Sequence, residues 1–525
     1  MALIPADQQK RKVALGQFYT PSAVTDFMVS QVENQHSLVL EARYGKGAFL
    51  DALIEKGFRN IEGHELDPVN AKAVSKRIGK KIKSYQGDFI LTPRIPDRDL
   101  VIGNPPYVSW NNIPSETKSF LTNDPFWSDL ANGEWDLLYA FLILSIERLK
   151  PGGQLLQIIP TNWFYSTHAS SLRNYLTEHG YVKQIIHFGE AKLFNDCAPN
   201  TIILDYRKSL ANQNKPEMMR VADYSGRSSD TQQIINDLEN VLAGETVEDW
   251  TLFDALQPQN DSCWYLATPE QQQFCQKLID AADNQELKNV AAVAVGMVSG
   301  ADQAFILDQE TAAKYRTVSS GLITNFVKAV NCQRYKLQGS SPYIWADAVA
   351  DEKTFKRDHK LVFAHLQQHK ALLDNRYIAA SRNWFAWATV RNLQILKTPN
   401  GQWKIFIPCI DRADQPRFCA SDQGELSAGD VLTIVPEKNS LYYLAWLNSS
   451  YVAEWYQISG ARSGKRWLYT HVFVSRIPVL IPGPKDKKIV AKITKLARKS
   501  LASGKPDDNA INKLFQKMID NRLVV

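Results

Sequence analysis

The chain has 525 residues, of which 44% are hydrophobic and 22% charged, and its formal net charge is +6. That length exceeds one ordinary domain and suffices for two or three packed cores. Six scattered cysteines without a Cys-x-x-Cys pair argue against a zinc site or a disulfide framework. No apolar run reaches the roughly 18 residues of a membrane span, and the first ten residues are not typical of a signal peptide. We therefore expect a soluble, cytoplasmic protein.

Strand-like and helix-like segments alternate through residues 1–210. Apolar runs predict strands at 37–42, 61–66, 84–89, 100–104, 154–160, 182–188 and 201–206. Helical spacing follows the first two strands over 47–56 and 70–80, and it precedes the fifth over 136–148. A βαβ series of this kind builds a mostly parallel sheet with helices on both faces. Ligands of such sheets bind beyond the carboxyl ends of the strands.

The ends of the first three strands carry residues that suit a nucleoside ligand. Gly45 and Gly47 permit a tight turn and a close approach of a ligand to the backbone. Glu65 follows Gly45 by 20 residues, which is the spacing of an acid that binds a ribose diol. Asp88 can accept a hydrogen bond from an adenine amino group while Phe89 packs on the ring. Because no Lys-Ser/Thr pair follows the glycines, the pattern favours S-adenosylmethionine over a nucleotide phosphate.

The fourth strand ends in Asn104-Pro105-Pro106-Tyr107. An asparagine oxygen and a backbone carbonyl can together accept both hydrogens of an exocyclic amino group. The two prolines fix φ and so fix the acceptors, and Tyr107 offers a face on which a base can stack. Asn-Pro pairs also mark ordinary turns, and for these four residues alone a turn is an equally good interpretation. The neighbouring strand ends favour a site that methylates an amino nitrogen.

Two further segments narrow the interpretation. Residues 15–21 (Leu-Gly-Gln-Phe-Tyr-Thr-Pro) lie upstream of the first strand, and Leu193-Phe194 precedes the apolar segment 200–204. With the strand ends, they resemble the motifs of the class I, S-adenosylmethionine-dependent N6-adenine DNA methyltransferases of the gamma class, which includes the Taq-type restriction–modification methylases. One departure stands out: the family usually writes Glu-Pro-Ala-Cys-Gly-x-Gly at the first strand end, and here Ala42-Arg43-Tyr44 replaces Pro-Ala-Cys.

The resemblance implies an α/β fold with a class I, Rossmann-like methyltransferase domain and a mostly parallel seven-stranded sheet. A mixed α+β DNA-recognition domain would follow it. We expect a catalytic domain over 1–210, a linker and helical spacer over 211–290, a target-recognition domain over 291–483 and a basic helical tail over 484–525.

The resemblance also implies roles for individual residues. The expected cofactor-binding residues are Tyr19, Thr20, Pro21, Glu41, Ala42, Arg43, Tyr44, Gly45, Gly47, Glu65, Asp88 and Phe89. The Asn104 side chain and the Pro105 carbonyl would accept the two N6 hydrogens of an adenine that has been flipped out of the duplex. Pro106 would complete the rigid motif, and Tyr107 and Phe194 would stack on the two faces of the base. Neither a metal ion nor a covalent intermediate is required.

The second half of the chain is rich in basic and aromatic residues. The glycine-containing stretch 459–467 predicts a DNA-binding loop with Arg462, Lys465 and Arg466. For the Arg- and Trp-containing stretch 376–391, DNA contacts and an ordinary tryptophan core stay equally open. Residues 484–525 have a net charge of +7, which fits phosphate binding, although a solvated helix face is the simpler alternative.

The leading interpretation is sequence-specific, adenine-specific methylation of double-stranded DNA at N6 with S-adenosylmethionine, within a restriction–modification system. RNA adenine or protein glutamine is an alternative target, because enzymes acting on them also use Asn-Pro-Pro-Tyr. A non-catalytic DNA-specificity subunit is a further alternative. We expect a monomer, since a recognition domain on the same chain needs no second copy, and a separate restriction endonuclease is a candidate partner.

Overall fold

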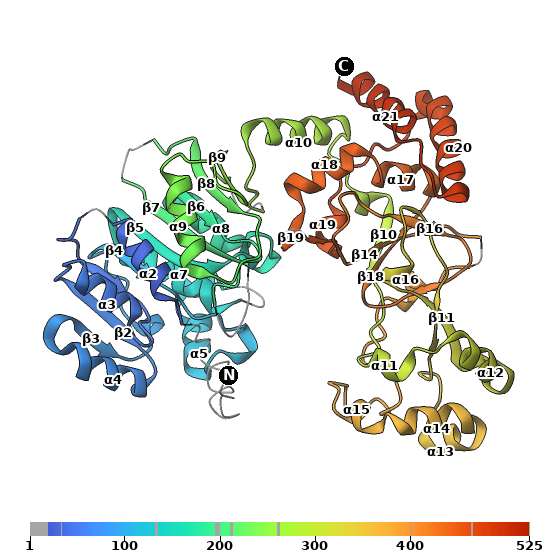
Figure 1. Ribbon diagram of the computed structural model, residues 1–525, viewed down its shortest axis with the longest axis horizontal. Coiled ribbons are helices and arrows are strands. Elements are labelled where there is room, and N and C mark those ends of the chain that lie inside the picture. Colours follow the sequence, from blue (N-terminus) through green and yellow to red (C-terminus); the bar gives the residue numbers. More distant parts are fainter. Residues whose placement is uncertain are drawn as a thin grey trace. The chain divides into compact units, whose positions relative to one another are not determined.

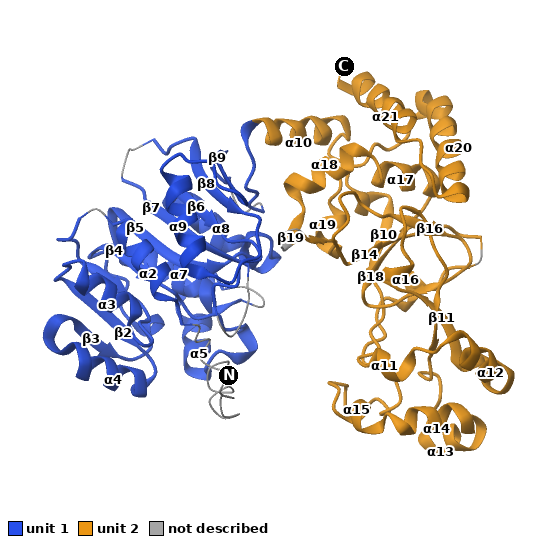
Figure 2. Cartoon of the chain, in the orientation of Figure 1, with its two compact units in different colours: residues 1–269, 463–465 blue, residues 270–462, 466–525 orange. Residues whose placement is uncertain are grey.

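A computed structural model describes residues 19–32, 34–131, 135–194, 200–210, 214–259, 263–399, 401–463 and 466–523. The chain divides into two compact units (Figure 2). The first unit contains residues 1–269 and 463–465, and the second contains residues 270–462 and 466–525. Each unit has its own sheets and its own buried core.

The first unit is built on a nine-stranded sheet, counted over the described residues (Figure 1). Its strands are β1 (Val39–Glu41), β2 (Ile61–Glu65), β3 (Lys83–Gln86), β4 (Arg98–Gly103), β5 (Leu149–Pro160), β6 (Gly180–His187), β7 (Thr201–Lys208), β8 (Met218–Tyr224) and β9 (Trp250–Leu256). Their order in the sheet is β3-β2-β1-β4-β5-β7-β6-β8-β9. β7 runs antiparallel to both of its neighbours and β9 antiparallel to β8, whereas the other pairs are parallel. The sheet is therefore mostly parallel, as predicted.

The sheet has two more strands than predicted, and this changes the domain boundary. β8 and β9 pair over seven residues each within the segment 211–290, which we expected to be a linker and helical spacer. That expectation is wrong for these strands. Four of the seven residues of β8 are buried, but two of these are neighbours, so the strand has no strict two-residue period that the sequence could reveal. The first unit consequently ends near residue 269 and not near 210.

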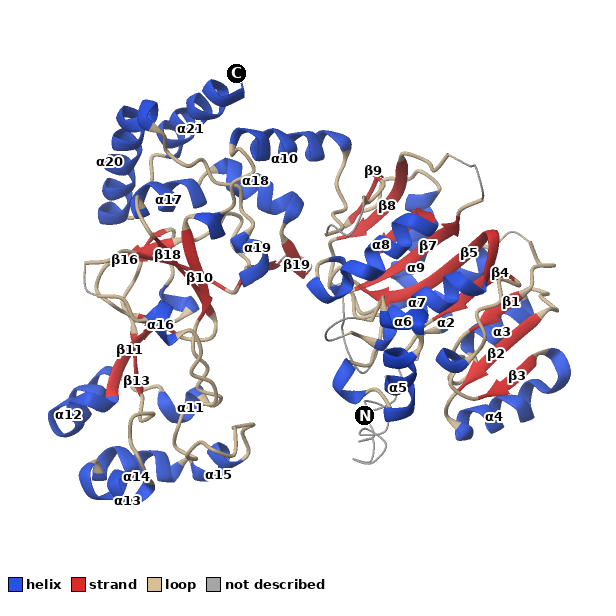
Figure 3. Cartoon of the chain, turned by 180° about the vertical axis from the view of Figure 1, so that it is seen from behind, coloured by secondary structure: helices blue, strands red, loops and turns tan. Residues whose placement is uncertain are grey.

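Helices cover both faces of the large sheet (Figure 3). They are α2 (Ser22–Ser30), α3 (Ala48–Glu55), α4 (Pro68–Ile78), α5 (Ser115–Asn123), α6 (Pro125–Ser128), α7 (Leu137–Arg148), α8 (Ser170–His179) and α9 (Thr231–Leu242). Side chains of α2, α3, α4 and α9 form one buried cluster, and side chains of α5 to α8 form another. α7 is buried on nearly all sides. Asp136 caps its N-terminus, because its side chain accepts a hydrogen bond from the Leu138 amide.

The second unit is a mixture of small sheets and helices. Its strand orders are β10-β18-β14-β16-β12, β13-β11-β17 and β15-β20-β19. The strands are β10 (Ala291–Val295), β11 (Ile323–Val327), β12 (Tyr335–Lys336), β13 (Ser341–Ile344), β14 (Lys404–Pro408), β15 (Ile410–Asp411), β16 (Cys419–Ser421), β17 (Leu426–Ser427), β18 (Val431–Pro436), β19 (Ala461–Ser463) and β20 (Arg466–Leu468). The helices are α10 (Pro269–Ala281), α11 (Asp302–Phe305), α12 (Gln309–Ser319), α13 (Glu352–Asp358), α14 (Lys360–Gln368), α15 (Lys370–Asp374), α16 (Leu393–Leu396), α17 (Ser440–Leu447), α18 (Ser450–Ser459), α19 (His471–Ser475), α20 (Lys487–Ser503) and α21 (Asp508–Leu523). Among the described ranges, no helix is both long and apolar enough to span a bilayer.

The stretch 376–391 contributes to the core of the second unit. The Trp387 ring is fully buried and lies 4.5 Å, centroid to centroid, from the ring of Phe326. The Arg376 guanidinium donates hydrogen bonds to the carbonyls of Ser299 and Ala386, at 2.5 and 3.1 Å, and thereby fixes the stretch. For Arg376 and Trp387, the structure agrees with the interpretation of this stretch as part of a core.

Candidate active site

A cavity of about 220 Å³ lies at the carboxyl ends of β1 and β4. Its lining residues are Tyr19, Thr20, Glu41, Arg43, Tyr44, Gly45, Lys46, Ala48, Phe49, Asn104 and Pro106. Most of them were predicted as site residues from motifs that are up to 87 positions apart in the sequence. Lys46 lies within the turn that was expected to bind the cofactor, whereas Ala48 and Phe49 were not predicted, because the chemistry of single apolar helix residues does not mark a site.

The glycine turn is anchored by Glu65. Its carboxylate accepts hydrogen bonds from the backbone amides of Gly45 and Asp67, both at 2.7 Å, and its side chain is fully buried. Gly47 has a φ of +84°, and a Cβ there would lie 2.8 Å from Nη2 of Arg77. Position 47 therefore requires glycine. The spacing of Glu65 predicted a ligand for ribose, but its second role as the anchor of the turn was not predicted.

The atypical Tyr44 is accommodated by a glycine on the neighbouring strand. A Cβ added to Gly63 on β2 would lie only 2.7 Å from Cδ1 of the Tyr44 ring. The ring is buried there, and its hydroxyl lies 2.7 Å from Oγ of Ser84. The bulky tyrosine thus points into the unit and packs on β2, so the turn keeps its shape.

Two residues of the cavity wall each have one buried side-chain atom without a hydrogen-bond partner. Oε2 of Glu41 and Nη2 of Arg43 are both buried and unpartnered, and both residues line the cavity. Burial, reinforced by the nearby Glu65 carboxylate, raises the pKa of Glu41 well above its ordinary value. Burial also lowers the pKa of Arg43. A ligand with an ammonium and a carboxylate group, such as the amino-acid end of S-adenosylmethionine, would supply a partner for each atom.

The Asn104 amide is oriented by two neighbours. Its Nδ2 donates a hydrogen bond to Oγ1 of Thr20 at 3.1 Å, and the Tyr107 hydroxyl donates to its Oδ1 at 2.7 Å. The same hydroxyl lies 3.1 Å from the carbonyl of Ile158 on β5. Tyr107 was expected to offer a stacking face. The structure adds the hydrogen bond from its hydroxyl, which orients the Asn104 oxygen.

The upstream motif meets the glycine turn. The Tyr19 ring lies 3.8 Å from the position of a Cβ on Gly45, and Nζ of Lys46 sits 4.2 Å from the centroid of that ring. Pro21 starts α2, since its carbonyl accepts from the amide of Thr25 at 3.1 Å. Residues 15–18 of the same motif lie outside the described ranges.

A smaller cavity adjoins the ends of β2 and β3. Its lining residues are Ala42, Arg43, Leu66, Gly87, Asp88, Phe89, Pro114, Leu137 and Phe141. Asp88 accepts hydrogen bonds from the Ile90 amide at 3.0 Å and from Oγ1 of Thr117 at 2.6 Å. The Phe89 ring is buried, and its centroid lies 5.4 Å from that of Phe141. The apolar wall formed by Pro114, Leu137 and Phe141 was not predicted, because single apolar residues in later segments carry no site signal.

Phe194 is not among the residues that line either cavity. It is buried in the same cluster as Phe188 and Leu193. Residues 195–199, which follow it, lie outside the described ranges. Its stacking role stays a prediction.

Two of the three predicted DNA-binding residues, Arg462 and Arg466, lie on strands of a small sheet. Arg462 is exposed on β19, with its guanidinium carbon 4.1 Å from the centroid of the Trp467 ring. Arg466 begins β20, whereas Lys465 is not among the described residues. The prediction of one continuous loop over 459–467 is therefore wrong: Ser459 ends α18, and residues 461–463 and 466–467 lie on the short strands β19 and β20. Polar strands of three residues are too short to show a period in the sequence.

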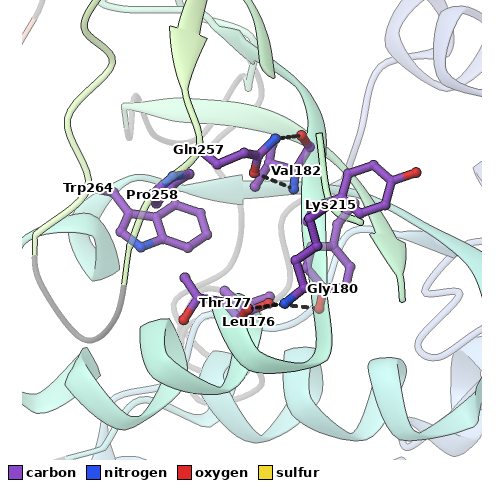
Figure 4. Close-up of a pocket in the computed structure, with 10 residues that line it drawn as sticks. Leu176, Thr177, Gly180, Val182, Lys215, Gln257, Pro258 and Trp264 are labelled. Atoms are coloured by element: carbon purple, nitrogen blue, oxygen red, sulfur yellow. Dashed lines mark hydrogen bonds between the residues drawn. The ribbon is translucent and has the colours of Figure 1, made fainter. Parts of the chain in front are cut away.

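A further small pocket of about 50 Å³ lies away from these strand ends (Figure 4). Lys215 donates to the carbonyls of Thr177 and Glu178, and Gln257 exchanges two hydrogen bonds with the backbone of Val182. Because its two long polar side chains already bind backbone atoms, we assign this pocket no ligand.

Comparison with known proteins shows the family. Residues 48–194 match the model of the Eco57I restriction-modification methylase family. The Type II methyltransferase M.MjaIV of Methanocaldococcus jannaschii is 34% identical over 228 residues, which cover 42% of this chain and 76% of that protein. The chain belongs to the restriction–modification methylases. The Type II methyltransferase M.HindII of Haemophilus influenzae is 27% identical over 528 residues, which cover 94% of this methylase and 95% of that protein.

Solved structures share the fold of this methylase. The Type IIL restriction-modification enzyme MmeI, solved in complex with DNA, superposes with a TM-score of 0.59 at 13% identity. That match covers 93% of this chain and 70% of MmeI. The DrdV–DNA complex superposes with a TM-score of 0.51 at 13% identity, covering 95% of this chain and 58% of that one. The predicted fold class, a class I methyltransferase domain followed by an α+β domain, is confirmed, with nine strands in place of seven.

Proposed function

We propose that this methylase transfers the methyl group of S-adenosylmethionine to N6 of adenine at a specific sequence of double-stranded DNA. It would be the modification component of a restriction–modification system. The observation that carries the proposal is the oriented Asn104 amide at the end of β4, on the wall of the same cavity as the glycine turn.

The Asn104 oxygen and the Pro105 carbonyl would accept the two hydrogens of the adenine amino group. An amide oxygen has two lone pairs, so Oδ1 can accept from the amino group while it accepts from Tyr107. Both hydrogen bonds draw the nitrogen lone pair out of ring conjugation and toward the methyl donor. Acceptors that are fixed before the reaction need no reorganisation in the transition state, and Pro105 and Pro106 restrict the backbone that carries them.

The cofactor would lie along the strand ends and supply an electrophilic methyl group. Glu41 and Arg43 would pair with its amino-acid end, next to Thr20 and the glycine turn at Gly45 and Gly47. The nucleoside end would contact Glu65, Ala42, Asp88 and Phe89. Tyr19, Pro21 and Tyr44 would support the turn. The enzyme would gain rate chiefly by positioning the two reactants.

An adenine inside a duplex is hidden, so it must be extruded at a cost of a few kcal/mol. Stacking on Tyr107 and Phe194 would offset part of that cost. Arg462, Lys465 and Arg466 would contact the phosphates and fix the register of the duplex. We further propose that the methylase acts as a monomer beside a separate restriction endonuclease.

Mapping of modified bases tests the substrate. Expression in a host that lacks adenine methylation should place N6-methyladenine at one recurring sequence of the genomic DNA, as read by single-molecule sequencing. The Asn104→Ala variant, expressed at the same level, should leave that sequence unmodified. Methylated cytosine at a recurring site would contradict adenine specificity. Unmodified DNA, with modified RNA or protein glutamine in the same cells, would favour the alternative targets.

Binding of the cofactor should depend on pH through Glu41. The raised pKa of Glu41 keeps a proton on the free protein, whereas an ammonium group nearby would favour the ionised form and lower that pKa in the complex. As the pH falls from the pKa of Glu41 in the free protein to its lower pKa in the complex, the affinity for S-adenosylhomocysteine should therefore fall about tenfold per pH unit. Above the pKa of the free protein, the affinity should stay constant. Calorimetric titration over a pH series measures this. The Glu41→Gln variant should bind more weakly at high pH and show a flat profile, and an equally steep profile in that variant would contradict the assignment.

A further inference from the structure

Helix α20 (Lys487–Ser503) presents four lysines on one face. They are Lys488, Lys492, Lys495 and Lys499, and we call them the lysine stripe. Their 4-3-4 spacing stacks them along the helix axis, and all four are exposed. Ile493, Ala497 and Ser500 are buried on the opposite side.

The charge of the stripe is not compensated within the second unit. No acidic residue occurs between positions 487 and 505, where Lys487, Arg498 and Lys505 add further exposed cations. Among the described residues, none forms an ion pair with any cation of α20. Two arginines near α20 are paired instead with carboxylates outside it: Arg522 contacts Asp486 at 3.1 Å, and Arg334 contacts Asp508 at 2.6 Å.

The arrangement argues against two other uses of a basic amphipathic helix. A membrane-surface helix needs a free apolar face to enter the lipid, but the apolar face of α20 packs against α17 and β12. A helix that is merely solvated is usually laced with acid–base pairs at i and i+4, and α20 contains none. What is left is a rigid row of like charges that faces the solvent.

We propose that the lysine stripe binds the phosphates of duplex DNA beside the target sequence. The stripe spans about 16 Å at 1.5 Å per residue. A duplex carries about ten phosphates over that length, so each lysine can face one. Lysine acts on phosphate as a point charge without reading bases, which suits a flank of arbitrary sequence. The inference deepens the proposed function, because it rests on duplex DNA as the substrate.

The test compares the wild-type chain with the stripe variant, Lys488→Gln, Lys492→Gln, Lys495→Gln and Lys499→Gln. Glutamine and lysine have similar helix propensities, so α20 should fold, which far-ultraviolet circular dichroism verifies. Binding of a duplex of about 40 base pairs is measured over a salt series. The slope of log Kd against log salt should fall by about 3 to 4, and affinity near 0.15 M salt should fall at least about tenfold. The pair Lys488→Gln and Lys495→Gln should give about half of the change in slope.

A matched variant removes the same charge elsewhere. Lys72→Gln, Lys76→Gln, Lys80→Gln and Lys81→Gln change four exposed lysines on α4 and the turn after it, in the first unit. Its salt slope should equal that of the wild type. A stripe variant with the wild-type slope overturns the inference, and so does an equal drop in both variants, which would indicate net charge alone. Loss of RNA affinity with unchanged duplex affinity also overturns it, in favour of an RNA partner.

The two proposals fail separately. The duplex contains the mapped target sequence, or any sequence if no modified base is found, since the phosphate contacts do not depend on bases. A stripe-dependent salt slope in a protein that leaves adenine unmodified would overturn the proposed function and support the stripe. If adenine is methylated and the stripe variant has the wild-type salt slope, the result would support the proposed function and overturn the inference about the stripe. At saturating DNA the stripe variant should keep the wild-type kcat.

Discussion

The Asn104→Ala variant should lose about 10² to 10³ in kcat, the cost of removing one fixed hydrogen-bonding group from a site where charge develops. The Asn104 oxygen is the acceptor that Thr20 and Tyr107 orient from either side. Alanine leaves the Pro105 carbonyl as the single acceptor for the amino group. Affinity for S-adenosylhomocysteine should stay within a few-fold of the wild type, because Glu41 and the glycine turn are untouched.

Single-turnover transfer of labelled methyl groups to DNA measures the first quantity, and calorimetry measures the second. Asn112→Ala is the matched control, because Asn112 lies eight positions later on an exposed turn, where it donates to Oγ of Ser109 at 3.2 Å. That control should keep the wild-type rate. A normal rate in Asn104→Ala would remove Asn104 from the mechanism. Equal loss of rate and of cofactor affinity would show that Asn104 acts in binding.

The second large effect is expected at Glu65, which anchors the glycine turn. Glu65→Ala leaves the part-buried amide of Gly45 and the buried amide of Asp67 without acceptors, and an unsatisfied buried group costs about 1–3 kcal/mol. We expect the free energy of unfolding of the first unit to fall by about 3 kcal/mol. Affinity for S-adenosylhomocysteine should fall at least about 100-fold, since the variant loses both the anchor of the turn and the proposed acceptor for ribose hydroxyls.

Thermal unfolding and calorimetric titration check this prediction together. Glu65→Gln keeps one oxygen for one of the two amides, so its loss of stability should be smaller than that of the alanine variant. Glu55→Ala removes an exposed carboxylate at the end of α3 and should change stability by less than about 0.5 kcal/mol. An alanine variant at 65 that matches Glu55→Ala in both measurements would show that the turn is held by other contacts.

Local sequence predicted the catalytic sheet and much of the cavity for one physical reason. Parallel strands end at one edge of a sheet, so residues such as Gly45, Glu65 and Asn104 meet there whatever lies between them. β1, β2 and β4 begin and end within about two residues of the predicted limits, whereas β5 begins five residues earlier and β3 ends three residues earlier than predicted.

What the sequence did not reveal depends on partners in space. Tyr44 departs from the family's usual turn sequence, and only its packing on Gly63 shows how it fits. The wall of Phe141 and Pro114 has no polar signature, and β8 becomes a strand because β6 offers it an edge. The hydrogen bond from Tyr107 to Asn104 depends on a rotamer, which spacing in a sequence does not determine.

The packing of Tyr44 on Gly63 restricts how such a turn can change during evolution. With any side chain at position 63, the tyrosine ring would overlap a Cβ 2.7 Å away. Glycine must therefore be present at 63 before, or together with, tyrosine at 44. The reverse step is asymmetric: restoring a small residue at 44 opens a void next to Gly63, which costs stability in proportion to its volume but causes no clash. Two positions 19 residues apart, one in the glycine turn and one on β2, are thus expected to change in a fixed order, with the smaller residue first.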